Sequence, residues 1–194
     1  MSWNRLGEWW RSERRDPTYA EEVVPMLLDV LQPQPGELYL DVGCGDGWIM
    51  EQVMTAGSAT VGCDLNPDLL ASAAIVAPVV QIELPALDCL RTESLDGAYV
   101  SLVIEHLSDE RPLFGGLARA VRPGGVLAVV INHPTFTAAG STPLLDEDGE
   151  VMWRPGGYFD RGHTEEPAGD GLVRFYHRTM AELLNAASEA GWDL

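Results

Sequence analysis

A cluster of three glycines flanked by acids constrains the fold of this chain more than any other feature. The cluster, Asp41-Val-Gly-Cys-Gly-Asp-Gly47, lies between an apolar strand pattern at 38–42 and a helical pattern at 48–56. Glycines at such a junction permit a tight turn and let a ligand approach the backbone at the helix N-terminus. Asp64 ends the next strand pattern, 64 − 43 = 21 residues after the first glycine, and in doubly wound folds an acid at about that spacing binds ribose hydroxyls. The cluster therefore predicts a nucleoside site.

Strand and helix patterns alternate through the first two-thirds of the chain. After 38–42 and 60–64, further strands are expected at 79–84, 97–103 and 126–131, with helices between them. Such alternation is typical of right-handed crossovers and of a mainly parallel sheet covered on both faces. The predicted fold class is α/β, with a doubly wound, mainly parallel sheet.

The chain is expected to form a single domain, 1–194, with four parts. Residues 1–32 are predicted to be an N-terminal helical cap, 36–131 a cofactor-binding core, and 177–191 a C-terminal helix. Residues 132–173 show neither the periodicity of a helix nor that of a strand, and they carry glycine, proline and acids. We therefore expect a long loop or lid there. Three helix starts are predicted from capping residues. They are the capping boxes Thr18 with Glu21 and Thr179 with Glu182, and Asn66-Pro67, where asparagine accepts from free amides and proline fits the first turn.

Charge and composition exclude several functions. The 12 basic residues against 30 acidic ones give a net charge of −18, which repels phosphate backbones and argues against nucleic acid as a partner. Every basic residue is arginine, so the chain has no lysine. This excludes Schiff-base chemistry with pyridoxal phosphate, P-loop phosphate binding and the Tyr-x-x-x-Lys relay of short-chain dehydrogenases.

Hydropathy and cysteine content indicate a cytoplasmic protein. No apolar run approaches the ~20 residues of a membrane span, and the N-terminus lacks the apolar stretch of a secretory signal. No membrane association is therefore expected. Cys44, Cys63 and Cys89 are an odd number of thiols without a Cys-x-x-Cys pair or a histidine at ligand spacing. We interpret them as small core residues in a reducing compartment and predict no metal site.

Four motifs resemble one enzyme family. Leu40-Asp-Val-Gly-Cys-Gly-Asp-Gly47 is similar to the first motif of class I S-adenosylmethionine-dependent methyltransferases. Segments 95–101 and 102–107 resemble that family's fourth strand and following turn, and Arg119-Ala-Val-Arg-Pro-Gly-Gly125 resembles its turn before strand five. The match covers about residues 20 to 191 and is with the small-molecule branch. It implies a Rossmann-like sheet of order 3-2-1-4-5, S-adenosylmethionine as cofactor, and methyl transfer to oxygen or nitrogen of a small-molecule acceptor.

The resemblance also implies the cofactor contacts. Asp41 and the glycine turn would face the methionine part and its ammonium, and Ser101 would lie near the amine. Asp64 would accept both ribose hydroxyls while Leu65 packs on the adenine. Glu83 and Leu84, which follow the third strand in the family pattern, would lie near the adenine. Asp88 is a rival for the place of Glu83. The full set of cofactor candidates is Asp41, Gly43, Cys44, Gly45, Asp64, Leu65, Glu83, Leu84 and Ser101.

Two histidines are the candidates for catalysis. Methyl transfer from a sulfonium chiefly needs alignment and exclusion of water, and a base helps when the acceptor is a hydroxyl or a protonated amine. His133 follows the fifth strand and His106 follows the fourth, at the sheet edge where ligands of open α/β sheets bind. Either could be the base or an acceptor contact, and for each a purely structural role stays open.

Two other functions stay open. A methyltransferase-like binding protein could keep the nucleoside pocket without turnover. A nicotinamide-dependent oxidoreductase is disfavoured by the Gly-x-Gly-x-Gly spacing, by Asp41, which would repel a pyrophosphate, and by the missing lysine.

The C-terminus departs from the family pattern. Family members usually continue after the last helix with strands 6 and 7, in the order 3-2-1-4-5-7-6, whereas only Trp192-Asp-Leu194 remains here. The apolar strand at 126–131 would then lie at a sheet edge and invite pairing. We expect a truncated sequence, a covering loop, or a homodimer formed through this edge.

Overall fold

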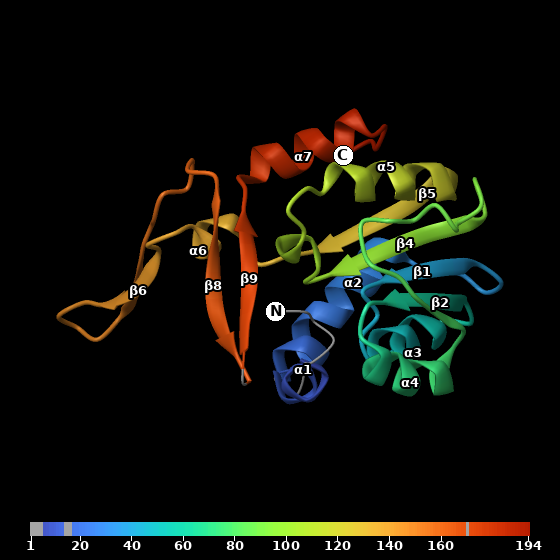
Figure 1. Ribbon diagram of the computed structural model, residues 1–194, viewed down its shortest axis with the longest axis horizontal. Helices are drawn as coiled ribbons and strands as arrows, with labels where there is room; N and C mark the ends of the chain where they lie inside the picture. Colours follow the sequence, from blue (N-terminus) through green and yellow to red (C-terminus); the bar gives the residue numbers. More distant parts are fainter. Residues whose placement is uncertain (1–5, 14–16, 170) are drawn as a thin grey trace.

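A five-stranded parallel sheet forms the centre of the molecule (Figure 1). The computed structural model describes residues 6–13, 17–169 and 171–194. The strand order is β3-β2-β1-β4-β5, which confirms the predicted fold class and order. The strands are β1 (Leu38–Val42), β2 (Ala59–Asp64), β3 (Val79–Gln81), β4 (Leu95–Ser101) and β5 (Val121–Val130).

Helices cover both faces of this sheet. On one face α5 (Arg111–Ala120) and α7 (Met180–Glu189) pack over the main core, which includes Leu40 and Val100. On the other face α2 (Val24–Leu31) packs on the sheet, followed by α3 (Trp48–Met54) and α4 (Pro67–Val76). Both faces are apolar, so the strands read as nearly continuous hydrophobic runs.

The parallel register of β1 and β4 places polar groups side by side. Successive side chains of a strand point to opposite faces. Leu40 and Val42 therefore enter the core under α5 and α7, whereas Asp41 points to the face of α2. Asp41 pairs directly with Tyr99, and Ser101 lies two residues further on the same face of β4.

The helix starts follow side-chain caps in two of the three predicted places. The Asn66 side chain accepts from the amides of Asp68 and Leu69 at the start of α4. Thr179 and Glu182 form the predicted capping box of α7. The box predicted at Thr18 is wrong, because Thr18 already has helical dihedral angles and makes no side-chain cap; a π-helical turn, η2 (Tyr19–Val23), leads into α2.

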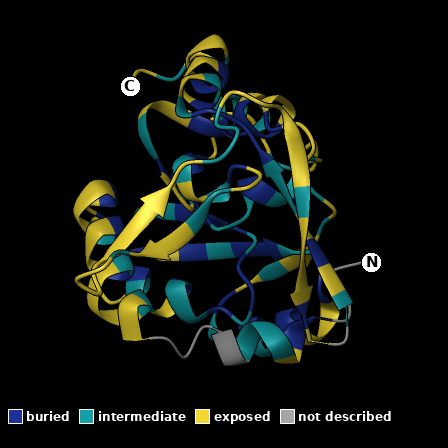
Figure 2. Cartoon of the chain, turned by 90° about the vertical axis from the view of Figure 1, so that its left-hand side faces the viewer, coloured by how far each residue is buried: buried dark blue, intermediate teal, exposed yellow. Residues whose placement is uncertain are grey.

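The expected long loop is instead regular structure. Residues 132–173 contain a short helix and three strands, and the last hairpin runs on to His177. In β7 every residue is exposed, and β8 is mostly exposed (Figure 2). Strands without a buried face lack the apolar-polar alternation by which strands are recognised. The elements are α6 (Pro134–Thr137), the hairpin β6 (Thr142–Leu145) with β7 (Val151–Arg154), and the hairpin β8 (Gly162–Ala168) with β9 (Gly171–His177).

An N-terminal helix and the second hairpin form a cover beside the carboxyl ends of the strands (Figure 1). The helix is α1 (Gly7–Glu13), and a small core of Leu6, Ala168 and Val173 joins it to the hairpin. The guanidinium of Arg11 donates to the Asp68 carbonyl and ties α1 to α4. Residues 1–5 and 14–16 of the predicted cap lie outside the described residues.

The cysteines follow the sequence analysis only in part. Cys44 and Cys63 are buried, as expected of core residues, but Cys89 is exposed in the turn region after β3. Among the helices that the structure describes, none is long and apolar enough to cross a bilayer.

Candidate functional site

The glycine turn folds back over the end of β2. The amides of Gly43 and Cys44 both donate to the Cys63 carbonyl, at 2.8 and 2.9 Å. Gly43 has a φ of +77°, and a Cβ added to it would lie 2.3 Å from Cγ2 of Val103. The turn needs glycine there because the backbone is left-handed and because Val103 occupies the space of a side chain.

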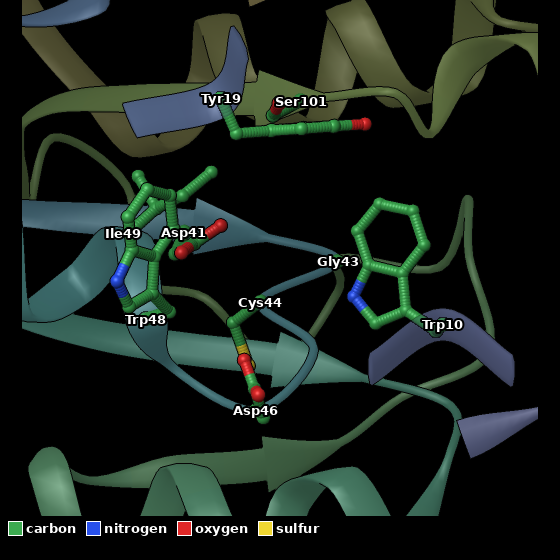
Figure 3. A pocket seen from close by; sticks show the side chains of 9 residues that line it. All are labelled: Trp10, Tyr19, Asp41, Gly43, Cys44, Asp46, Trp48, Ile49 and Ser101. Atoms are coloured by element: carbon green, nitrogen blue, oxygen red, sulfur yellow. The ribbon is translucent and has the colours of Figure 1, made fainter. Parts of the chain in front are cut away.

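A cleft opens between this turn, the end of β4 and the N-terminal helices. The space between its lining residues, part of which is open to solvent, is about 350 Å³. Trp10 of α1 stands across the cleft from Trp48 and Ile49, and the Asp41 carboxylate points into the gap (Figure 3). The lining residues are Trp10, Tyr19, Asp41, Gly43, Cys44, Asp46, Trp48, Ile49 and Ser101.

Two buried oxygen atoms of the cleft, Oδ2 of Asp41 and Oγ of Ser101, have no well-aligned hydrogen-bond partner among the described residues. The Tyr99 hydroxyl lies beside the Asp41 carboxyl group and interacts with it. Burial raises the pKa of Asp41 well above the usual range for aspartate, the Asp64 charge raises it further, and the nearby Tyr99 hydroxyl opposes this rise. An unpaired buried carboxylate costs free energy. A cationic hydrogen-bond donor entering the cleft would relieve that cost.

Asp64, the last residue of β2, stabilises the glycine turn through hydrogen bonds. Its Oδ2 accepts from the Gly45 amide at 2.9 Å, and its Oδ1 accepts from the Asn66 amide at 2.8 Å. Burial raises the pKa of Asp64, and these backbone hydrogen bonds oppose the rise. Each carboxylate oxygen can accept a second hydrogen bond, so bracing the turn and binding a ribose are compatible.

The remaining cofactor candidates are not among the residues that line the cleft. Leu65 is partly buried at the end of β2, and its carbonyl accepts from the Gln81 side chain at 2.9 Å. Glu83 is exposed in the turn after β3, whereas Leu84 packs against the main core. Their contacts with an adenine stay predictions.

The two candidate histidines have different surroundings. Nδ1 of His106 lies 2.9 Å from the Arg174 carbonyl, and the ring packs 4.7 Å from Phe175 of β9. Burial lowers the pKa of His106, so the ring is neutral at pH 7. His133 is exposed, and its Nδ1 accepts from the Thr135 amide at 3.2 Å as the cap of α6. Neither ring lines the cleft, and their catalytic roles stay predictions.

Sequence reasoning missed four residues near the cleft. Asp46, Trp48 and Ile49 line it because the turn leads directly into α3. Tyr99 lies beside Asp41 through the register of two strands. The sequence does contain a signal for Tyr99. Side chains alternate between the two faces of a strand, so paired positions of two neighbouring parallel strands lie on the same face.

Comparisons with known proteins agree with this geometry. Residues 40–129 match the model of a methyltransferase domain family. The chain is 28% identical to an S-adenosylmethionine-dependent methyltransferase structure from Mesorhizobium loti, covering 87% of this chain and 80% of that one with a TM-score of 0.75.

Two curated relatives are O-methyltransferases by name. The ubiquinone biosynthesis O-methyltransferase of Rhizobium etli is 29% identical, over 65% of this chain and 53% of the relative. The malonyl-[acyl-carrier protein] O-methyltransferase of Serratia marcescens is 30% identical, over 65% of this chain and 48% of the relative. This chain thus spans about half the length of each.

The family model matches the segment that supplies seven of the nine residues lining the cleft. It begins at Leu40, before the glycine turn, and ends within β5, so it includes Asp41, Asp64 and Ser101. The five-stranded order, the braced glycine turn and the matched domain agree. Residues 40–129 thus match a methyltransferase domain, and the fold is that of the class I S-adenosylmethionine-dependent methyltransferases.

Proposed function

We propose that this protein transfers a methyl group from S-adenosylmethionine to an oxygen or nitrogen of a small-molecule acceptor. One observation carries the proposal: the cleft beside the glycine turn contains buried acceptor atoms of Asp41 and Ser101 that lack well-aligned partners among the described residues. The names of the two curated relatives support oxygen as the acceptor atom.

The chemistry of the cleft fits this cofactor. S-adenosylmethionine is cationic at its ammonium and sulfonium, and Asp41 and Asp46 give the cleft an acidic lining. Asp41 and Ser101 would accept from the ammonium, and Asp64 would accept from the ribose hydroxyls. The bound cofactor supplies an already activated methyl group.

The aromatic lining would exclude water from the reacting groups. Trp10 and Tyr19 meet edge to face, with ring centroids 6.2 Å apart, and Trp48 lies on the opposite side of the cleft. Aromatic faces also attract cations, which suits a sulfonium. Alignment and exclusion of water are the main requirements of an in-line methyl transfer.

The proposal is tested by binding and by turnover. Calorimetry should detect S-adenosylmethionine and S-adenosylhomocysteine but not NADH. Formation of S-adenosylhomocysteine is then followed with a panel of phenols, carboxylic acids and amines. Binding without turnover across the panel would favour the inactive binding protein, and binding of NADH alone would favour the oxidoreductase.

Replacing Asp64 with alanine should weaken S-adenosylmethionine binding by about 1.5–3 kcal/mol, because two hydroxyls lose a charged acceptor. The Gly45 amide loses its partner as well, so the melting temperature should also fall. Calorimetry on the folded variant measures the effect. Asp68→Ala, which removes an exposed carboxylate from α4, is the control, and unchanged affinity in Asp64→Ala would refute the assignment.

The β8–β9 hairpin is proposed to act as a lid. It packs on α1 through Leu6 and Trp9, and α1 carries Trp10 into the cleft. Amide hydrogen exchange in β8–β9 should therefore slow when S-adenosylhomocysteine binds. The β6–β7 hairpin, whose residues are mostly exposed, serves as the internal control. Equal changes in both hairpins, or none in β8–β9, would contradict the lid.

Two further expectations belong to this proposal. Among the described strands, β5 pairs with β4 alone, so its other edge would be the surface for a homodimer. A reducing cytoplasm suits three unpaired thiols, and the net charge of −18 disfavours nucleic acid as the acceptor.

A further inference from the structure

A buried glutamate at the end of β4 has no part in the cofactor cleft. Glu105 lies in the short turn η3 (Ile104–His106) that follows the strand, and only 7% of its surface is exposed. Its Oε1 accepts from Nδ2 of Asn132 at 3.1 Å. Its Oε2 is buried and has no partner among the described residues. A half-satisfied buried carboxyl is costly, and nothing in the cofactor site accounts for it.

Asn132 stands where a second substrate would approach. It follows β5, as Glu105 follows β4, so the hydrogen bond joins the carboxyl ends of two adjacent parallel strands. Ligands of open α/β sheets bind along this edge. Asn132 is exposed whereas Glu105 is buried, so the pair reaches from the interior to the surface.

The hydrogen bond fixes which atom of the amide faces outward. A side-chain amide has one accepting oxygen and one donating nitrogen. An ionised carboxylate can only accept, so it holds the Nδ2 end of Asn132 and leaves the Oδ1 end directed away from Glu105.

We propose that Glu105 is a positioning residue for the methyl acceptor: its carboxylate holds the Asn132 amide so that Oδ1 accepts a hydrogen bond from the acceptor's hydroxyl or amine. The inference rests on the proposed function and adds the chemical class of the acceptor, a hydrogen-bond donor. A protonated Glu105 can donate to Oδ1, in which case the amide turns and presents its nitrogen outward.

The surroundings of Glu105 allow this titration. Burial raises the pKa of Glu105, and the backbone amide of Glu105 itself, the backbone and side chain of Asn132 and the charge of Arg178 oppose the rise. Arg178 itself is held by Glu110 at 3.0 Å and by two carbonyls of the η3 region. The neighbouring His106 is turned to β9 by its contact with the Arg174 carbonyl.

The test follows the side-chain amide of Asn132 by nuclear magnetic resonance in the full chain. The signal is assigned by its loss in Asn132→Ala. In the wild type it should shift with pH along a single titration curve whose midpoint lies above 4.5, the ordinary pKa of glutamate. In Glu105→Gln the shift should disappear. Glu110→Gln removes another buried carboxylate beside Arg178. In this control variant the pH-dependent shift of the Asn132 signal should persist.

Phenol and anisole then probe the acceptor class. Phenol has a hydroxyl that can donate a hydrogen bond, whereas the methoxy group of anisole can only accept one. Above the midpoint, phenol should move the Asn132 signal and anisole should not, both with and without S-adenosylhomocysteine. An Asn132 signal that ignores pH, or that phenol and anisole affect equally or not at all, overturns the inference. Only the assignment needs a variant, at the exposed Asn132, and the pH and ligand measurements themselves use the wild type. Failure of the proposed function would appear separately, as absence of S-adenosylhomocysteine binding in calorimetry.

Discussion

Replacing Gly43 with alanine should lower the free energy of unfolding by about 3 kcal/mol and abolish cofactor binding. The added Cβ would lie 2.3 Å from Cγ2 of Val103, at a φ of +77°. The left-handed backbone costs an L-residue about 1–2 kcal/mol, and overpacking costs about 1–3 kcal/mol more. Relief of the clash requires a shift of the turn away from β4, which displaces the backbone that borders the cleft.

Gly36→Ala provides the matched control for this prediction. Gly36 has a similar φ of +86°, but a Cβ there meets no atom within 4 Å. Its replacement should therefore cost only the backbone term, about 1–2 kcal/mol, and leave binding intact. Urea unfolding and calorimetry on both variants separate the two contributions. Equal losses of stability would show that contact with Val103 is unimportant.

The glycine turn illustrates what the sequence could predict. Its place between a strand and a helix, and the acid that ends the next strand, follow from local patterns. The partners do not, because Val103 fills the space beside Gly43 and Trp10 lies 3.0 Å from a Cβ position at Gly45. These residues are distant in sequence: the strand order brings Val103 to the turn, and the packing of α1 brings Trp10 there.

The limits of prediction elsewhere have the same origin. Strands of the central sheet are buried and apolar, so their composition identifies them. The strands of residues 132–173 have little burial, and their hairpin pairing left no periodic signal. Thr18 carried a capping pattern, but Thr18 itself already has helical dihedral angles, so tertiary packing prevailed over a local preference.

The candidate site was predictable as a location and only partly as a set of contacts. Asp41 and Ser101 line the cleft, and their contacts with a cofactor stay predictions. The histidines were chosen because they follow strands, but a strand end does not determine where a ring points. Glu105 follows the same strand as His106 and was overlooked, because its hydrogen bond to Asn132 joins residues 27 positions apart.

Replacing Asp41 with asparagine should weaken S-adenosylmethionine binding about 100-fold while making the free protein more stable at neutral pH. Removing one member of a buried charge pair costs about 2–5 kcal/mol, and 100-fold corresponds to about 2.8 kcal/mol. Asp29→Asn, an exposed carboxylate of α2, controls for the general loss of charge and should bind normally.

The gain in stability of Asp41→Asn follows from the direction of the pKa shift. Burial raises the pKa of Asp41 in the folded state, so the protonated form favours folding and that contribution is lost as pH rises through the folded pKa. Asparagine does not titrate and should stabilise the free protein by about 1–3 kcal/mol at pH 8, with a smaller gain at pH 5. Urea unfolding at both pH values measures this difference.

With saturating S-adenosylmethionine the wild type should become more stable than Asp41→Asn, because the ligand stabilises the wild type more strongly. A variant that is less stable than the wild type without ligand would show that Asp41 holds the fold together, and unchanged affinity would remove it from the cofactor site.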